Sequence, residues 1–135
     1  MVLPLLLLLF AGIVDFGLMF QRYEVLTNAA REGARLASLP SYTVDTTISE
    51  HVLNYMAAGL GADRNTLAVT TTVDRTGTLS GAPVVRVTVD FDSDFIILGP
   101  IMRLFSGGDW TTLTLRAESV MRCEAGDTCS ATPAP

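Results

Sequence analysis

Apolar residues fill the first twenty positions of the chain almost without interruption. This run, MVLPLLLLLFAGIVDFGLMF, contains one proline and one aspartate among apolar residues and glycine. Twenty helical residues at about 1.5 Å each span about 30 Å, the thickness of the hydrocarbon layer of a bilayer. Pro4 falls in the first helical turn, where its missing N–H costs nothing. The pattern therefore predicts a membrane-spanning helix over residues 1–20.

A cleaved signal peptide is the competing interpretation of this run. Such a peptide carries a basic region before its apolar stretch and a small-residue cleavage site after it. Neither feature is visible here, and the helical pattern continues through Arg22 to Ala37. We therefore favour an anchor that stays attached to the chain.

Beyond Phe20, apolar and small residues recur three or four positions apart. This spacing predicts that the same helix continues as an amphipathic helix over residues 21–38, until Leu39-Pro40 ends it. Its predicted inward stripe is Tyr23, Leu26, Ala30, Gly33 and Ala37. We expect small side chains within NAAREGARLA (residues 28–37) to let a sheet approach the helix backbone closely: Ala29, Ala30, Gly33 and Ala34. Arg31 and Arg35 in the same stretch face either solvent or a partner, and we favour solvent.

A second helix is predicted over residues 41–61. Asp45 or a nearby threonine is expected to cap it, and Gly59 and Gly61 to end it. The residues spaced for its apolar face are Val44, Ile48, Val52, Tyr55 or Met56, and Leu60.

Three later segments alternate apolar and polar residues, as half-buried strands do. They are residues 66–73, 84–91 and 110–122, and the turn-rich DRTGTLSGAP (residues 74–83) is interpreted as the connector between the first two. Each strand has one apolar and one polar face, which indicates an antiparallel sheet covered on one side. The predicted fold is α+β and pilin-like: a long N-terminal helix packed on about three antiparallel strands, with a second helix.

Two features of the chain are candidates for contacts with partners. Asp15 is the one ionisable residue in the predicted span, where it either pairs with a neighbouring subunit or lies close enough to the interface to reach water. Residues 95–105, FIILGPIMRLF, have three interpretations: a plug for the core, a segment at the bilayer surface, or a partner contact. The candidate residues are Pro4, Gly12 and Gly17 for helix bundling beside Asp15, and Ile97 and Met102 for the insert.

Composition argues against several classes of function. The 135-residue chain has a net charge of −5 and no cluster of basic residues, so nucleic-acid binding is not expected. Asp90, Asp92 and Asp94 imitate half of a calcium loop, but Phe95 replaces the required glycine, and we place them on the solvated face of a strand. His51 is interpreted as a surface residue. We expect no catalytic set, cofactor, metal ion or small-molecule substrate.

Cys123 and Cys129 lie close together around a Gly-Asp turn. They are either paired in a disulfide or unpaired thiols, and we favour the disulfide because we expect an anchored domain outside the cytoplasm. The expected organisation is a membrane half-helix (1–20), its amphipathic continuation (21–38), an α+β domain outside the cytoplasm (39–122) and a cysteine-containing tail (123–135).

Two motifs carry a resemblance to a known family. LPLLLLLFAGIVDFG followed by LTNAAREGARLA resembles the TadE-like family of pilus-assembly proteins, strongly over residues 2–37 and more weakly beyond. The resemblance implies a single-pass protein of the bacterial inner membrane, with pilin-like or other membrane subunits as partners. Members of the family carry a basic leader and a processing site that this sequence does not show.

The predicted function is that of a non-enzymatic minor pilin that assists assembly of a tight-adherence pilus by lateral helix packing. A single-span accessory subunit of a photosynthetic, respiratory or transport complex is the alternative. By the positive-inside rule, Arg22, Arg31 and Arg35 oppose export of the domain. We therefore expect the natural N-terminus to lie further upstream.

Overall fold

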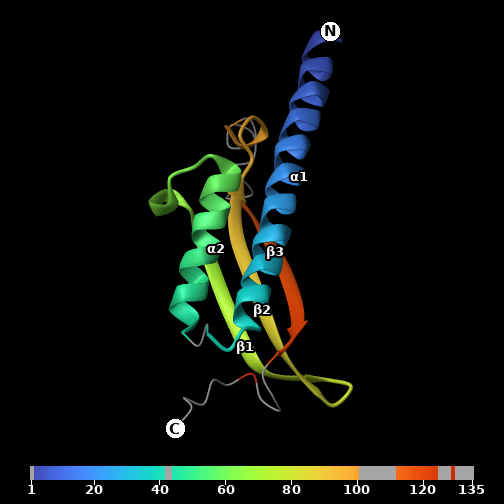
Figure 1. Ribbon diagram of the computed structural model, residues 1–135. Coiled ribbons are helices and arrows are strands. Elements are labelled where there is room, and N and C mark those ends of the chain that lie inside the picture. Colours follow the sequence, from blue (N-terminus) through green and yellow to red (C-terminus); the bar gives the residue numbers. More distant parts are fainter. Residues whose placement is uncertain (1, 42–43, 101–111, 125–128, 130–135) are drawn as a thin grey trace.

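The computed structural model describes residues 2–41, 44–100, 112–124 and 129. In chain order, its elements are α1 (Leu3–Ala37), α2 (Asp45–Leu60), η1 (Arg64–Thr66), β1 (Val69–Leu79), β2 (Ala82–Asp94) and β3 (Thr112–Arg122). Two helices lie on one face of a three-stranded antiparallel sheet of order β1-β2-β3 (Figure 1). The structure thus confirms the predicted α+β fold.

Helix α1 has two halves with different surroundings. Its N-terminal half extends beyond the rest of the domain, whereas its C-terminal half lies against α2 and the sheet (Figure 1). The helix ends at Ala37, and the Ser38 hydroxyl donates a 2.7 Å hydrogen bond to the carbonyl of Arg35. The prediction of one continuous helix is confirmed.

The C-terminal half of α1 contributes the centre of the core. Leu26, Ala30 and Ala37 of the predicted stripe are at most 2% exposed, but Tyr23 is 45% exposed and does not face the core. The N-terminal end of the predicted stripe was therefore wrong. The sheet contributes the alternating side chains of Val85, Val87 and Val89, all of which are fully buried.

Gly33 lies where α1, α2 and β2 meet. A Cβ atom at this position would lie 2.8 Å from Cγ2 of Val52 on α2 and 3.2 Å from Cγ1 of Val87 on β2. Small residues on α1 therefore admit both the sheet that the sequence predicted and the second helix. Gly59 on α2 has the same role, because a Cβ there would lie 2.6 Å from Cγ1 of Val25.

Helix α2 begins at Asp45, four residues later than the predicted start at residue 41, and the prediction that Asp45 caps it was wrong. Val44 occupies the N-cap position and makes no side-chain capping bond, so Asp45 is the first helical residue. Ile48, Val52 and Met56 face the core, and Tyr55 is 43% exposed, which resolves the choice between Tyr55 and Met56.

The long connector expected over residues 74–83 is not present. Strand β1 continues to Leu79, and a two-residue turn at Ser80-Gly81 leads directly into β2. Both turn residues have positive φ, 52° and 81°, as the tightest hairpin turns require. The polar residues Asp74–Thr78 look turn-like in sequence, but pairing with β2 keeps them extended.

A β-bulge in β1 redirects Arg75. Asp74 pairs with Arg86 and Gly77 with Val84, so two residues of β1, Arg75 and Thr76, lie opposite Val85 alone. Such an extra residue bends a strand and changes where a side chain points.

The Arg75 side chain joins three segments of the chain. Its guanidinium donates to the carbonyls of Ala37 (2.9 Å) and Cys129 (3.3 Å) and forms an ion pair with Asp45 at 3.1 Å. It thereby connects the end of α1, the start of α2 and the disulfide. Cys123 and Cys129 are bonded, with Cα atoms 5.5 Å apart, which confirms the predicted disulfide.

Candidate functional site

The N-terminal half of α1 exposes apolar side chains on almost every side. From Leu5 to Phe10 each residue is more than half exposed, and Ile13, Phe16 and Phe20 are 63–68% exposed. Leu5–Ala37 is the one helix in the described part of the chain with the length and hydropathy of a membrane span. A domain in water does not normally leave so much contiguous apolar surface uncovered.

Asp15 interrupts this apolar surface and is itself buried, with 3% exposure. Its Oδ1 atom accepts hydrogen bonds from the backbone N–H groups of Ile96 (3.2 Å) and Ile97 (3.1 Å). Its Oδ2 atom accepts from Ile97 (3.1 Å) and Leu98 (2.6 Å). Three consecutive N–H groups thus surround one carboxylate.

This arrangement gives Asp15 a partner within its own chain, which neither interpretation from the sequence foresaw. Pairing with a neighbouring subunit stays a prediction. The chain after β2 turns sharply at Ile96 and becomes helical at Leu98, and a carboxylate is a favourable acceptor for the N–H groups of such a turn. The contact joins the apolar half of α1 to the end of the sheet.

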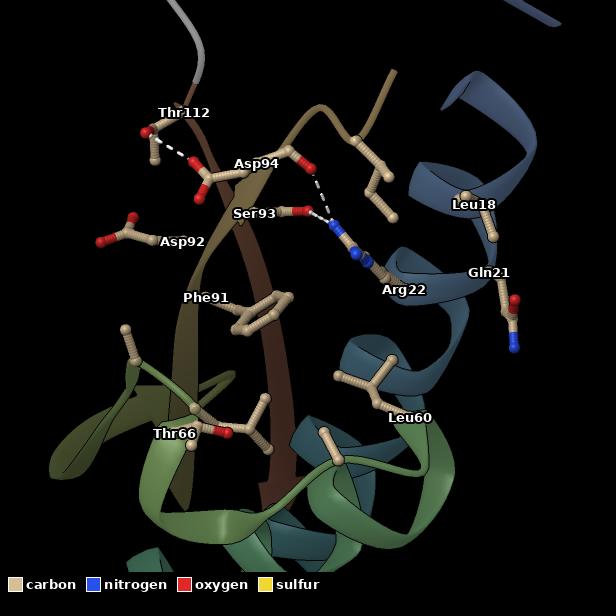
Figure 2. Close-up of a pocket in the computed structure, with 14 residues that line it drawn as sticks. Leu18, Gln21, Arg22, Leu60, Thr66, Phe91, Asp92, Ser93, Asp94 and Thr112 are labelled. Atoms are coloured by element: carbon tan, nitrogen blue, oxygen red, sulfur yellow. Dashed lines mark hydrogen bonds between the residues drawn. The ribbon is translucent and has the colours of Figure 1, made fainter. Parts of the chain in front are cut away.

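Arg22 makes a second connection between the same two elements. Its Nη1 atom donates to the hydroxyl of Ser93 (2.5 Å) and to the carbonyl of Asp94 (3.0 Å). Ser93 is 1% exposed, so its hydroxyl depends on this partner. Figure 2 shows the Arg22 side chain reaching from α1 to the end of β2.

An open groove of about 500 Å³ lies beside Arg22, between α1, the segment after α2 and the end of β2. Leu18, Leu60 and Phe91 supply apolar surface, and Arg22 and Ser93 supply polar groups (Figure 2). These two polar groups are bonded to each other, and no cluster of metal-ligating side chains occurs among the described residues.

Asp90, Asp92 and Asp94 lie on the face of β2 that the helices leave open. Each accepts a hydrogen bond from β3: from Arg116 at 2.7 Å, from Thr114 at 2.6 Å and from Thr112 at 2.7 Å, respectively. The hydrogen bond from Arg116 is the main cause of the lowered pKa of Asp90; burial opposes it, and the charge of Arg116 adds to the lowering. These carboxylates are therefore parts of cross-strand pairs, as expected for a solvated strand face.

The remaining predicted site residues lie in the core, along the apolar half of α1 or in the insert. Ala29, Ala30 and Ala34 are fully buried in the core, whereas a Cβ at Gly12 or Gly17 would have no other atom within 4 Å. Pro4 lies in the first turn of α1, and the part of the insert that contains Met102 falls outside the described residues.

The two arginines of NAAREGARLA are exposed, and Arg35 binds Glu32 at 2.8 Å. The hydrogen bond from Arg35 is the main cause of the lowered pKa of Glu32, and His51, exposed on α2, contributes through its charge.

Two connections at this site were missed by the sequence interpretation. The Asp15 contact uses backbone N–H groups, which every residue except proline has, so no side chain signals it. Arg22 had a weak signal, since it is the first cation after the apolar run, but nothing in the sequence pairs it with Ser93.

Together, an apolar helical half, an α+β domain and two polar connections between them fit the class of membrane-anchored, pilin-like proteins. Residues 1–35 match the family model described as TadE-like protein, which confirms over that segment the resemblance noted in the sequence. No curated protein and no solved structure gives a significant match to the chain.

Proposed function

We propose that the chain is a non-enzymatic minor pilin that assists assembly of a tight-adherence pilus by lateral packing of α1 with other helices. The observation that carries this proposal is the division of α1. Its C-terminal half is the core of the domain, whereas its N-terminal half exposes apolar side chains along its length. A helix of this kind is covered by lipid, by other helices, or by both in turn.

Gly12 and Gly17 support lateral packing. Neither has a neighbour in the space that a Cβ would fill, so both leave the helix backbone accessible from outside the domain. Membrane helices associate through small residues because these let the backbones approach closely. Five residues rotate an α-helix by about 140° beyond a full turn, so the two glycines open different sides of α1 to a partner helix.

The proposed location is the bacterial inner membrane, with one span and the domain outside the cytoplasm. The Cys123–Cys129 disulfide supports this side of the membrane, because disulfides persist in oxidising compartments. Membrane and pilin-like subunits are the proposed partners.

Co-purification from native membranes through a C-terminal tag tests the proposal. We expect pilus-assembly components to be retained by the wild-type chain. Gly12→Leu should lose them, because added bulk separates the helices, whereas Phe10→Trp, which exchanges one large aromatic side chain for another and changes neither glycine, should retain them. Recovery of pigment- or cofactor-bearing subunits instead would favour the alternative, an accessory subunit of another membrane complex.

Asp15→Leu is expected to stay bound to the membrane and to abolish pilus assembly. Normal piliation by this variant would show that Asp15 has no part in pilus assembly. The role of the glycines would still be tested by co-purification with Gly12→Leu.

A further inference from the structure

We propose that Ile96, Ile97 and Leu98, the docking corner, insert into the lipid interface beside α1, so that the domain rests on the bilayer. The inference rests on the proposed membrane anchoring of α1. Its ligand is the lipid surface itself, contacted by a part of the domain far from α1 in sequence.

Hydrogen bonds fix the depth of the docking corner. All three of its backbone N–H groups bind the Asp15 carboxylate, at 2.6–3.2 Å. Asp15 precedes Arg22 by seven residues, or about 10 Å along a helix. When Arg22 lies among the lipid headgroups, the docking corner lies near the boundary between headgroups and acyl chains.

The exposed side chains at this level are apolar on both elements. Ile96 is 54% and Ile97 36% exposed on the docking corner. Ile13 and Phe16, within one turn of Asp15 on α1, are 63% and 68% exposed. The segment 95–100, FIILGP, carries no charge. Lipid covers both surfaces at once, because they lie at one depth on adjoining elements.

Asp15 also lowers the usual cost of placing a loop in lipid. Non-helical backbone is excluded from the hydrocarbon region unless its polar groups are bonded. Here the three N–H groups of the docking corner have an acceptor, and the carboxylate has donors in place of water. Each side of this contact thereby lowers the cost of burying the other.

Depth-dependent quenching tests the proposal on the full chain in phosphatidylcholine–phosphatidylglycerol vesicles. An environment-sensitive fluorophore is attached at Ile97→Cys, or at Ile96→Cys as a second position, with the native disulfide kept oxidised. Leu8→Cys in the apolar half of α1 and Thr72→Cys on the exposed side of β1 are the controls. Nitroxide-labelled lipids quench from the membrane, and iodide quenches from water.

We expect the probe at position 97 to be quenched several-fold more by nitroxide lipids than the probe at Thr72, and to be protected from iodide. If iodide quenches the probe at position 97 as strongly as the probe at Thr72, the docking corner lies in water and the proposed insertion is wrong. Protection from both quenchers also overturns it, because protein and not lipid would then cover this site. If the probe at Leu8 is open to iodide, the membrane anchor itself has failed, which separates the two proposals.

Discussion

The carboxylate of Asp15 accepts a 2.6 Å hydrogen bond from the backbone N–H of Leu98, 83 residues further along the chain. Asp15 belongs to the apolar half of α1, and Leu98 follows the last residue of β2 by four positions. Because the neighbouring N–H groups of Ile96 and Ile97 bind the same carboxylate, this contact holds the end of the sheet against the predicted span.

Asp15→Asn is predicted to loosen this connection without unfolding the domain. The amide loses the charge and one of the two acceptor atoms. Hydrogen bonds to charged groups contribute about 1.5–3 kcal/mol, which corresponds to a roughly ten- to hundredfold change in local opening. Hydrogen exchange of the purified chain in detergent should therefore accelerate at Ile96–Leu98 by about this factor.

The amides of Val87 and Val89, in the centre of β2, are the internal control and should exchange at the wild-type rate. Unchanged exchange at Ile96–Leu98 in the variant would show that Asp15 does not hold this segment.

Gly33→Ala is predicted to destabilise the domain although alanine is the better helix former. The new methyl group would lie 2.8 Å from Cγ2 of Val52 and 3.2 Å from Cγ1 of Val87, and β-branched side chains have few alternative rotamers. Overpacking of this kind costs about 1–3 kcal/mol, more than the roughly 1 kcal/mol gained from helix propensity. Thermal unfolding followed by circular dichroism measures the difference.

Gly17→Ala is the matched control, since no atom lies within 4 Å of the added methyl group. It should leave the melting temperature unchanged or raise it. Equal melting temperatures for the two variants would mean that the helices and sheet can separate at Gly33 without cost.

Arg75→Met is predicted to destabilise the domain by about 2–3 kcal/mol, because the carbonyls of Ala37 and Cys129 lose a charged donor in a partly buried place. Methionine keeps most of the apolar stem of the side chain. The free energy of unfolding, from denaturant titration in detergent, provides the measurement.

Asp45→Asn separates the ion pair from the carbonyl contacts. The Asp45 side chain is 56% exposed, and such pairs contribute at most about 1 kcal/mol. A loss in Asp45→Asn as large as that in Arg75→Met would assign the stabilisation to the ion pair.

The Asp90–Arg116 pair is predicted to add a pH-dependent part to stability. The pKa of Asp90 is lower in the folded chain than its ordinary value of about 3.9, so the folded state binds its proton less readily. The stabilisation by the pair is therefore fully present when the pH is above the ordinary pKa of about 3.9, and it is lost as the pH falls through the lowered pKa of Asp90.

Asp90→Asn should therefore flatten the decrease of melting temperature below about pH 4. The change is small because the Arg116 side chain is 69% exposed, and added salt should shrink it further. Arg116→Gln should reproduce the flattening. If the melting temperatures of both variants fall with pH as steeply as that of the wild type, the Asp90–Arg116 pair is not the source of the pH dependence.

Local patterns determined most of the fold. Period-3.6 spacing identified α1 and α2, and period-2 alternation identified the three strands together with their buried faces. These predictions succeeded because the positions of apolar side chains depend directly on which face of an element is buried. The same logic placed Asp90, Asp92 and Asp94 on the open face of the sheet.

Composition gave a misleading signal in the segment that joins the first two strands. Polar residues and glycine indicated a connector over residues 74–83, but only Ser80-Gly81 turns. Pairing with β2 extends the rest, and the bulge absorbs the extra residue. Propensity describes a segment alone, whereas strand pairing depends on the neighbour across the ladder.

By itself, the sequence determined an apolar N-terminal helix, an α+β domain with one covered sheet face and a resemblance to TadE-like proteins, and it favoured a disulfide that the structure then showed. Only the tertiary structure decided that Asp15 binds the segment after β2, that Arg22 meets Ser93, and that Arg75 joins three chain segments. The reason is physical: periodicity records burial within one element, but backbone donors and carbonyls look alike at every residue. Which of them meet a given side chain depends on how distant elements pack.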